Sequence, residues 1–191
     1  MSKIARVRVY MACSLDGFIA GPDHDISWLH QDHSAPGDLA KDPDALEFDE
    51  FMSQVGAMLM GRSTYEVVAP MAAEGPWIYG ELPILVATRR PLSPVAKTIS
   101  ATQGPIEELI DQAKALAGDK DVYLDGGDVV RQAIDANLVD ELTITFVPIL
   151  LGKGARLFDG LLKRTALQFS AHHAFGGGLL QVSAQLNKAH G

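Results

Sequence analysis

Two glycine-containing turns carry residue types that bind phosphate groups. The first, after the apolar run 57–60, contains Gly61, Arg62, Ser63 and Thr64, and the second, after the run 122–124, contains Gly126, Gly127, Asp128 and Val129. Where a strand passes into a helix through glycine, a ligand can approach free backbone N–H groups closely, and the helix start attracts anions. Two such turns suggest a nucleotide. For Gly126-Gly127 taken alone, a tight turn with no ligand is the competing explanation.

Histidine and cysteine raise the question of a metal or thiol site. His24, His30 and His33 alternate with aspartates, but their spacing matches no fixed ligand pattern, so an exposed polar loop is the better interpretation. Cys13 has no thiolate-stabilising neighbour in the sequence, which favours a packing role. We therefore expect no metal site.

Length and composition limit the class of protein. The 191 residues fit one domain, 1–191, and 47% apolar residues with a mean hydropathy of +0.08 are typical of a compact soluble protein without a membrane-spanning run. A net charge of −8 argues against nucleic-acid binding, because phosphate backbones need a basic face. The first residues lack the features of a secretory signal, and a single cysteine cannot form an internal disulfide. We therefore expect a cytoplasmic protein.

Apolar periodicity predicts alternating strands and helices. The predicted strands are 4–13, 57–60, 84–88, 122–124, 139–147, 165–174 and 179–186, and the predicted helices are 43–55, one that follows Gly61 and stops near Pro70, 105–117 and 128–136. Strands separated by helices favour an α/β fold with a mostly parallel sheet covered on both faces. The last two strands form an antiparallel hairpin at its edge. The loop 21–42 is long enough to suggest that it covers a site.

Four motifs, in this order, resemble those of the dihydrofolate reductase-like superfamily. They are Ser14-Leu15-Asp16-Gly17-Phe18-Ile19-Ala20, Met60-Gly61-Arg62-Ser63-Thr64-Tyr65-Glu66, Asp125-Gly126-Gly127, and the segment 148–158. The last segment resembles the branch that contains the reductase domain of bifunctional riboflavin-biosynthesis proteins, and the resemblance covers nearly the whole chain. It implies a three-layer αβα sandwich with a mixed sheet of about eight strands, NADPH as hydride donor, and often a homodimer. The apolar hairpin at the sheet edge also favours a homodimer.

The resemblance also assigns the cofactor-binding residues. The positions that match those of the family are Gly61, Arg62, Ser63, Thr64, Gly126, Gly127, Asp128 and Val129 for the phosphates, and Ala12, Ile19 and Ala20 for the nicotinamide. The 2′-phosphate needs a fixed cation, for which Arg62 and the cluster Thr88-Arg89-Arg90 are suited. Solvated surface charge is the competing explanation for this cluster.

Hydride transfer to a C=N or C=O bond needs a proton, and a carboxylate near the substrate is the expected source. Asp125 directly precedes the paired glycines, where riboflavin-type reductases carry an acidic residue. Asp44 and Glu47 lie one turn apart on the predicted helix 43–55, where dihydrofolate reductases place the acid that binds the pterin, but the spacing from Trp28 departs from the family's pattern. A charge that complements the helix dipole also explains Asp44. The sequence leaves these candidates open.

Two functions remain. The first is an NADPH-dependent reductase that acts on a small heterocyclic or carbonyl compound and resembles dihydrofolate reductase and 5-amino-6-(5-phosphoribosylamino)uracil reductase. Dihydrofolate itself is less expected, because the insertion between Trp28 and Gly61 changes the pterin side of the cleft. The second is a non-catalytic protein that keeps the fold and a nucleotide or ligand site but has lost the substrate carboxylate.

Overall fold

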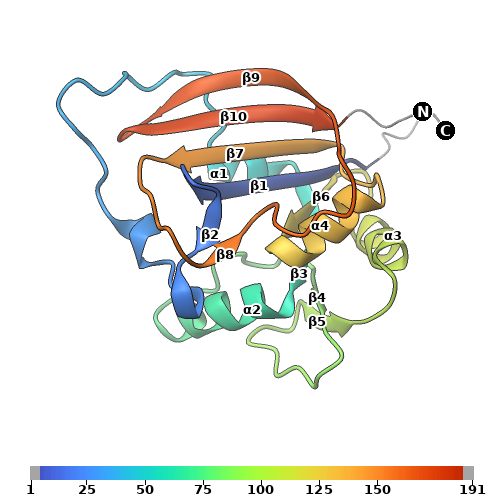
Figure 1. Ribbon diagram of the computed structural model, residues 1–191. Helices are drawn as coiled ribbons and strands as arrows, with labels where there is room; N and C mark the ends of the chain where they lie inside the picture. Colours follow the sequence, from blue (N-terminus) through green and yellow to red (C-terminus); the bar gives the residue numbers. More distant parts are fainter. Residues whose placement is uncertain (1–4, 187–191) are drawn as a thin grey trace.

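The computed structural model describes residues 5–186 and shows an eight-stranded sheet at the centre of the protein (Figure 1). Across the sheet the strands lie in the order β5-β4-β3-β6-β1-β7-β10-β9. Neighbours from β5 to β7 are parallel, whereas β10 is antiparallel to both β7 and β9. These strands are β1 (Val7–Ser14), β3 (Val55–Gly61), β4 (Ile84–Ala87), β5 (Ile99–Thr102), β6 (Asp121–Asp125), β7 (Glu141–Val147), β9 (Leu167–Gly176) and β10 (Leu179–Leu186). The predicted mixed, mostly parallel sheet with an antiparallel hairpin at its edge is confirmed.

Helices cover both faces of this sheet. They are α1 (Phe48–Ser53), α2 (Arg62–Val68), α3 (Ile106–Ala117) and α4 (Gly127–Asp135), with the short 3-10 segments η1 (Pro22–His24), η2 (Ser27–His30) and η3 (Ala69–Ala73). On β3, Leu59 packs in the cluster that contains α3 and α4, and the next residue, Met60, packs in the cluster that contains α1 and α2. The predicted three-layer αβα sandwich is therefore present. The longest helix, α3, has 12 residues, and no helix within residues 5–186 has the length and apolar character needed to cross a membrane.

The structure corrects the predicted helix 43–55, because α1 is shorter and excludes both Asp44 and Glu47. The backbone N–H of Leu46 donates to the side-chain oxygen of Gln181 on β10, and the Leu46 carbonyl accepts from the side-chain nitrogen of Gln181, each at 2.9 Å. Backbone groups held by a strand side chain are not available to a helix. Asp44 and Glu47 therefore precede α1 and do not share a helical turn.

Three short strands were not expected from the sequence. They are β2 (Phe18–Ala20), β5 and β8 (Ala155–Arg156). β5 forms one edge of the large sheet, and β2 pairs with β8 in a separate two-stranded sheet. Segments of two to four residues are too short to show apolar alternation. Ile4, at the start of the predicted strand 4–13, lies outside the described residues.

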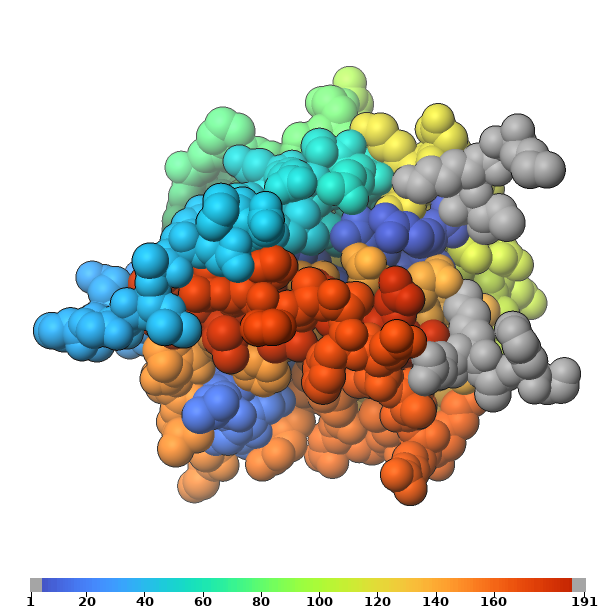
Figure 2. All heavy atoms as spheres, turned by 90° about the horizontal axis from the view of Figure 1, so that it is seen from above, coloured from blue at the N-terminus to red at the C-terminus, as the bar shows by residue number. Residues whose placement is uncertain are grey.

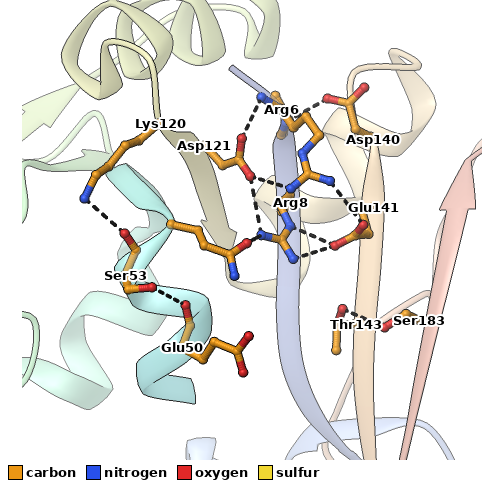
Figure 3. A network of polar contacts seen from close by, with 12 residues as sticks. Arg6, Arg8, Glu50, Ser53, Lys120, Asp121, Asp140, Glu141, Thr143 and Ser183 are labelled. Atoms are coloured by element: carbon orange, nitrogen blue, oxygen red, sulfur yellow. Dashed lines mark hydrogen bonds and ion pairs between the residues drawn. The ribbon is translucent and has the colours of Figure 1, made fainter. Parts of the chain in front are cut away.

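A buried ion network joins the amino-terminal ends of the central strands (Figure 3). The guanidinium of Arg8 on β1, 4% exposed, lies 3.4 Å from the carboxylate of Asp121 on β6 and 2.6 Å from that of Glu141 on β7. Its Nη1 also donates to the side-chain oxygen of Gln54, at the end of α1, at 2.7 Å. The neighbouring Arg6 binds Asp121 at 2.8 Å. Arg6 also lies 3.5 Å from Glu141, so each guanidinium is held by both β6 and β7.

This network fixes the alignment of β1 between its two neighbours. A buried charge costs free energy unless its hydrogen-bonding groups find partners, and removal of one partner of such a pair typically costs about 3–5 kcal/mol. A shift of β1 by one residue would place Arg8 on the apolar face of the sheet. The ring of Phe51 lies 4.9 Å from the Arg8 guanidinium, which attaches α1 to the same point.

Candidate active site

A cavity of about 570 Å³ opens at the carboxyl-terminal ends of β1, β3 and β6. The predicted site residues that line it are Ala12, Ile19, Ala20, Gly61, Arg62, Ser63, Thr64, Asp125, Gly126, Gly127, Asp128 and Val129. The predicted residues that do not line it are Asp44, Glu47, Thr88 and Arg89. The carboxyl ends of parallel strands meet at one edge of a sheet, where open α/β sheets bind ligands. The motifs that are far apart in the sequence thus meet in one place.

Close packing explains the glycines of the second turn. Gly126 has a φ of +97°, and a Cβ there would collide with the Thr64 hydroxyl of α2. A Cβ at Gly127 would lie 2.7 Å from Nη1 of Arg131 and 3.3 Å from the Ile19 side chain. Both glycines line the cavity, so the backbone at the start of α4 is directly accessible from it.

Arg62 of the first turn and Arg90, after β4, share one carboxylate, that of Glu66. Nε of Arg62 donates to Glu66 at 2.9 Å, and Nη1 of Arg62 donates to the Pro91 carbonyl at 2.9 Å. Arg90 also binds Glu66, at 3.2 Å, and the hydrogen bond from Arg62 lowers the pKa of that carboxyl. Arg62 is thus a fixed positive group at the cavity wall. Arg89 is exposed just beyond the end of β4, outside the cavity.

Two further arginines line the cavity and were missed by the sequence analysis. Arg131 of α4 donates to the carbonyl of Arg156 at 2.9 Å and forms an ion pair with Asp128. The guanidinium of Arg156 lies 4.5 Å from the centre of the Phe18 ring. The spacing of Asp128 and Arg131 on a predicted helix was a signal for their ion pair. Nothing in the sequence indicated that β8 would bring Arg156 to the cavity.

Asp125 is the acidic residue best placed for chemistry. It ends β6, its side chain is half-buried, and it faces the cavity. Burial raises the pKa of its carboxyl to about 6, an effect that the neighbouring Gly126 N–H and Tyr123 hydroxyl partly offset. An acid with this pKa exchanges protons near neutral pH, which suits it to donate or accept a proton.

The other carboxylates considered from the sequence lie elsewhere. Asp44 is exposed, and its backbone N–H donates to Asp42 at 2.9 Å in a turn before α1. Glu47 forms an ion pair with Lys41. Trp28 is buried and donates to the Asp25 carbonyl at 3.2 Å. Asp125 is therefore the one acid among the three candidates that reaches the cavity.

Aromatic side chains form the wall next to Asp125. Tyr10, Phe48 and Tyr123 line the cavity, and the Tyr123 hydroxyl donates to the Tyr10 carbonyl at 2.9 Å. The ring of Tyr10 lies 5.7 Å from that of Phe48, at a tilt of 54°. Their positions on a buried strand and a short helix looked like ordinary core in the sequence, so they were missed.

The predicted loop 21–42 does cover the cavity with part of its length. His24, Ile26 and Leu29, in and around η1 and η2, are among the lining residues. The loop therefore closes one side of the site, as its length suggested.

Asp16 joins the first and last sequence motifs. Its carboxylate accepts the N–H groups of Leu151 and Gly152, at 3.1 and 2.8 Å, and the Ser14 hydroxyl at 2.6 Å. These hydrogen bonds, that of Ser14 above all, lower the pKa of the Asp16 carboxyl to about 2. The loop after β7 is thereby fixed to the turn between β1 and β2.

Thiol and metal chemistry have little support in the described residues. Cys13 is buried, and burial raises the pKa of its thiol to about 11, so it is not a thiolate at neutral pH. His173 binds the carboxylate of Asp42 at 2.8 Å. Residues 5–186 contain no group of three or more His, Cys, Asp or Glu side chains suited to a metal ion.

A model of the RibD C-terminal domain matches residues 5–181. The chain belongs to this family. Two Bacillus subtilis (strain 168) proteins, both named as uncharacterized, are similar to it over most of their length. YwjB is 29% identical over 168 residues, which cover 88% of this chain and 91% of YwjB. YyaP is 27% identical over 194 residues, which cover 94% of each chain.

Solved structures share this RibD-like fold. A putative riboflavin biosynthesis protein from Shewanella sp. PV-4 has a TM-score of 0.77 at 24% identity, covering 96% of this chain and 99% of that one. A bifunctional diaminohydroxyphosphoribosylaminopyrimidine deaminase/5-amino-6-(5-phosphoribosylamino)uracil reductase from Thermotoga maritima has 0.65 at 16% identity, covering 96% of this chain and 57% of that one. Dihydrofolate reductase from Enterococcus faecalis, complexed with NADP(H), has 0.56 at 17% identity, covering 98% and 100%. The predicted dihydrofolate reductase-like fold is confirmed.

The raised pKa of Asp125 predicts a pH-dependent cost to stability. The folded protein holds this proton more tightly than the unfolded chain, where the pKa is about 3.9, so the wild type loses stability as the pH rises from about 4 to about 6. Asp125→Asn removes the ionisation. We expect it to raise the free energy of unfolding by about 1–3 kcal/mol at pH 8 and to have little effect at pH 4, measured by urea unfolding.

Asp44→Asn is the matched control, because Asp44 is exposed. It should change the free energy of unfolding by less than about 0.5 kcal/mol at either pH. A difference between wild type and Asp125→Asn that is the same at pH 4 and pH 8 would contradict the burial of this charge.

Proposed function

We propose that this RibD-like protein is an NADPH-dependent reductase in which Asp125 supplies the proton. The observation that carries the proposal is the carboxyl of Asp125, half-buried and with its pKa raised to about 6, directly before the Gly126-Gly127 turn in the cavity. Family membership and the fold shared with reductases support it. The site suits a dinucleotide phosphate, because the backbone of Gly126 and Gly127 at the start of α4 lines the cavity, as does the cationic side chain of Arg62.

Each part of the cavity has a separate task in this proposal. NADPH, when bound, supplies a hydride. Arg62 and the backbone at the start of α4 would hold its phosphates, with Ala12 and Ile19 against the nicotinamide. Protonated Asp125 then donates to the heteroatom of the bond that accepts the hydride, and becomes a carboxylate that takes its next proton from solvent.

The substrate that we propose is a small heterocyclic or carbonyl compound. Flat aromatic side chains, Tyr10 and Phe48, stand beside the acid and suit a planar ring. The Thermotoga maritima protein is named as a reductase of 5-amino-6-(5-phosphoribosylamino)uracil, and this chain spans 57% of its length. NADPH oxidation should therefore be measured with that compound, with dihydrofolate and with simple carbonyl compounds. NADPH binding without turnover of any of them would favour the non-catalytic alternative.

Replacement of Asp125 tests its chemical role. Asp125→Asn should lower kcat by about 10²-fold or more while the Kd of NADPH changes less than twofold, because the amide keeps the shape but has no proton to donate. The wild-type kcat should fall as the pH rises above about 6, and the variant should lack this limb. Steady-state kinetics and calorimetric titration of NADPH provide the two readouts.

Asp44→Asn again serves as the comparison and should keep wild-type kcat. A larger loss at Asp44 than at Asp125 would move the assignment to the segment before α1. Loss of NADPH affinity in Asp125→Asn would make the role of this residue structural.

The preference for NADPH over NADH is a separate test. The 2′-phosphate is a dianion that a protein of net charge −8 repels unless fixed cations lie beside it. We expect Arg62→Ala to weaken NADPH binding by about tenfold to a hundredfold, since one charge-assisted contact is worth about 1.5–3 kcal/mol. NADH binding should change little, as measured by calorimetric titration.

Arg164→Ala is the control for the loss of one positive charge, because Arg164 is exposed and does not line the cavity. It should bind both nucleotides like the wild type. Equal losses for NADPH and NADH in the Arg62 variant, or a wild-type preference for NADH, would overturn the assignment.

We also propose a homodimer formed through the edge strand β9. The side chains of Phe169 and Leu167 on this strand are 74% and 43% exposed, and an exposed apolar edge strand favours pairing with a second copy. Light scattering at micromolar concentration should give twice the mass of one 20.5 kDa chain. Phe169→Lys should give a monomer, and a wild-type monomer would contradict the proposal.

A further inference from the structure

Gln181 is a fully buried polar side chain on β10. Its oxygen accepts the Leu46 N–H at 2.9 Å, and its nitrogen donates to the Leu46 carbonyl at 2.9 Å. The nitrogen also lies 3.3 Å from the Thr145 hydroxyl and 3.5 Å from the Tyr10 hydroxyl. A buried amide without partners costs free energy, so this set of contacts strongly favours one position of the Leu46 backbone.

The Leu46 backbone in turn supports the aromatic wall of the cavity. Its carbonyl accepts a second hydrogen bond, from the Tyr10 hydroxyl at 2.8 Å. The Tyr10 ring stacks on Phe51 at 4.8 Å and contacts Phe48, which begins α1 two residues after Leu46. Tyr10 and Phe48 line the cavity, whereas Gln181 does not. Gln181 therefore acts on the cavity only through these residues.

A second anchor lies on the same hairpin. The Asp42 N–H donates to the Ala174 carbonyl of β9 at 2.8 Å, and the Asp42 carboxylate binds His173 at 2.8 Å. Figure 2 shows the light-blue segment before α1 lying against the orange-red strands of the hairpin. Residues 31–47 contain no helix or strand, so their position depends on contacts of this kind.

We propose that Gln181 is a positioning residue that sets the shape of the substrate end of the cavity, by holding Leu46 and so the Tyr10 and Phe48 rings. The proposal rests on the proposed reductase function. The two glycine turns make no hydrogen bond to this amide, so the cofactor end should be independent of it. Replacement of Gln181 should therefore change substrate binding and leave NADPH binding unchanged.

The first test follows the backbone and needs no substrate. Hydrogen exchange is measured for the amides of residues 46–49 in the wild type, in Gln181→Met and in Gln181→Asn. Both variants should exchange the Leu46 amide at least tenfold faster, while α3 amides keep their wild-type rates. Gln185→Met is the matched control, because Gln185 is exposed on the same strand, and it should leave the Leu46 amide unchanged.

The second test separates substrate from cofactor. With the compound that the wild type reduces fastest, Gln181→Met should raise KM at least tenfold, with the Kd of NADPH within twofold of wild type. If Gln181 had a purely structural role, Gln181→Met would lower the amount of folded protein, but the folded fraction would show no rise in KM relative to the Kd of NADPH. Equal losses in KM and NADPH affinity would overturn the proposal.

The two proposals can fail separately. A wild type that turns over no compound contradicts the reductase function, and the exchange experiment still decides whether Gln181 holds Leu46. A wild-type Leu46 amide that exchanges as fast as that of the exposed Asp49 would overturn the positioning role, even if neither Gln181 variant folds.

Discussion

The guanidinium of Arg8 is the buried charge around which the centre of the protein is arranged. Its charge and hydrogen-bonding groups are satisfied by Asp121 on β6, Glu141 on β7 and Gln54 directly after α1. These partners meet only in one alignment of β1, and the same alignment places Tyr10 and Ala12, farther along the strand, at the cavity. The charge network at one end of the sheet therefore determines which side chains face the ligand at the other end.

The two ends of the cavity differ in how they are built. The end with Gly126 and Thr64 is made of two strand-to-helix turns in close contact, and at Gly126 a Cβ would collide with the Thr64 hydroxyl, so its shape follows directly from the sheet. The end with Phe48 follows a segment without helix or strand, which is held by Gln181 from the hairpin. Rigid turns suit a cofactor that is the same for many reactions, and a supported loop suits a substrate that varies.

The parts that sequence reasoning predicted are those with local causes. The glycine turns at Gly61 and Gly126 and the helix α3 have signals within a few residues, and the structure has them where they were expected. The predicted helix 43–55 was wrong because the backbone of Leu46 is held by Gln181, well over a hundred residues away in the sequence. A single glutamine on a predicted strand does not indicate that its amide is buried. The position of Arg156 at the cavity was not predicted for a similar reason, because β8 forms only by pairing with β2, which is distant in the sequence.

Asp16 makes one structural unit from two stretches that lie far apart along the chain. It binds the backbone of Leu151 and Gly152, and nearby a Cβ at Gly154 would collide with the Ala20 carbonyl. The conformation of each stretch therefore depends on contacts with the other. In a chimera between two family members, both stretches have to come from the same parent. A crossover between them would combine two segments whose contacting residues come from different proteins. Crossovers that keep residues 16–20 and 151–156 from one parent can exchange the remaining elements without breaking this junction.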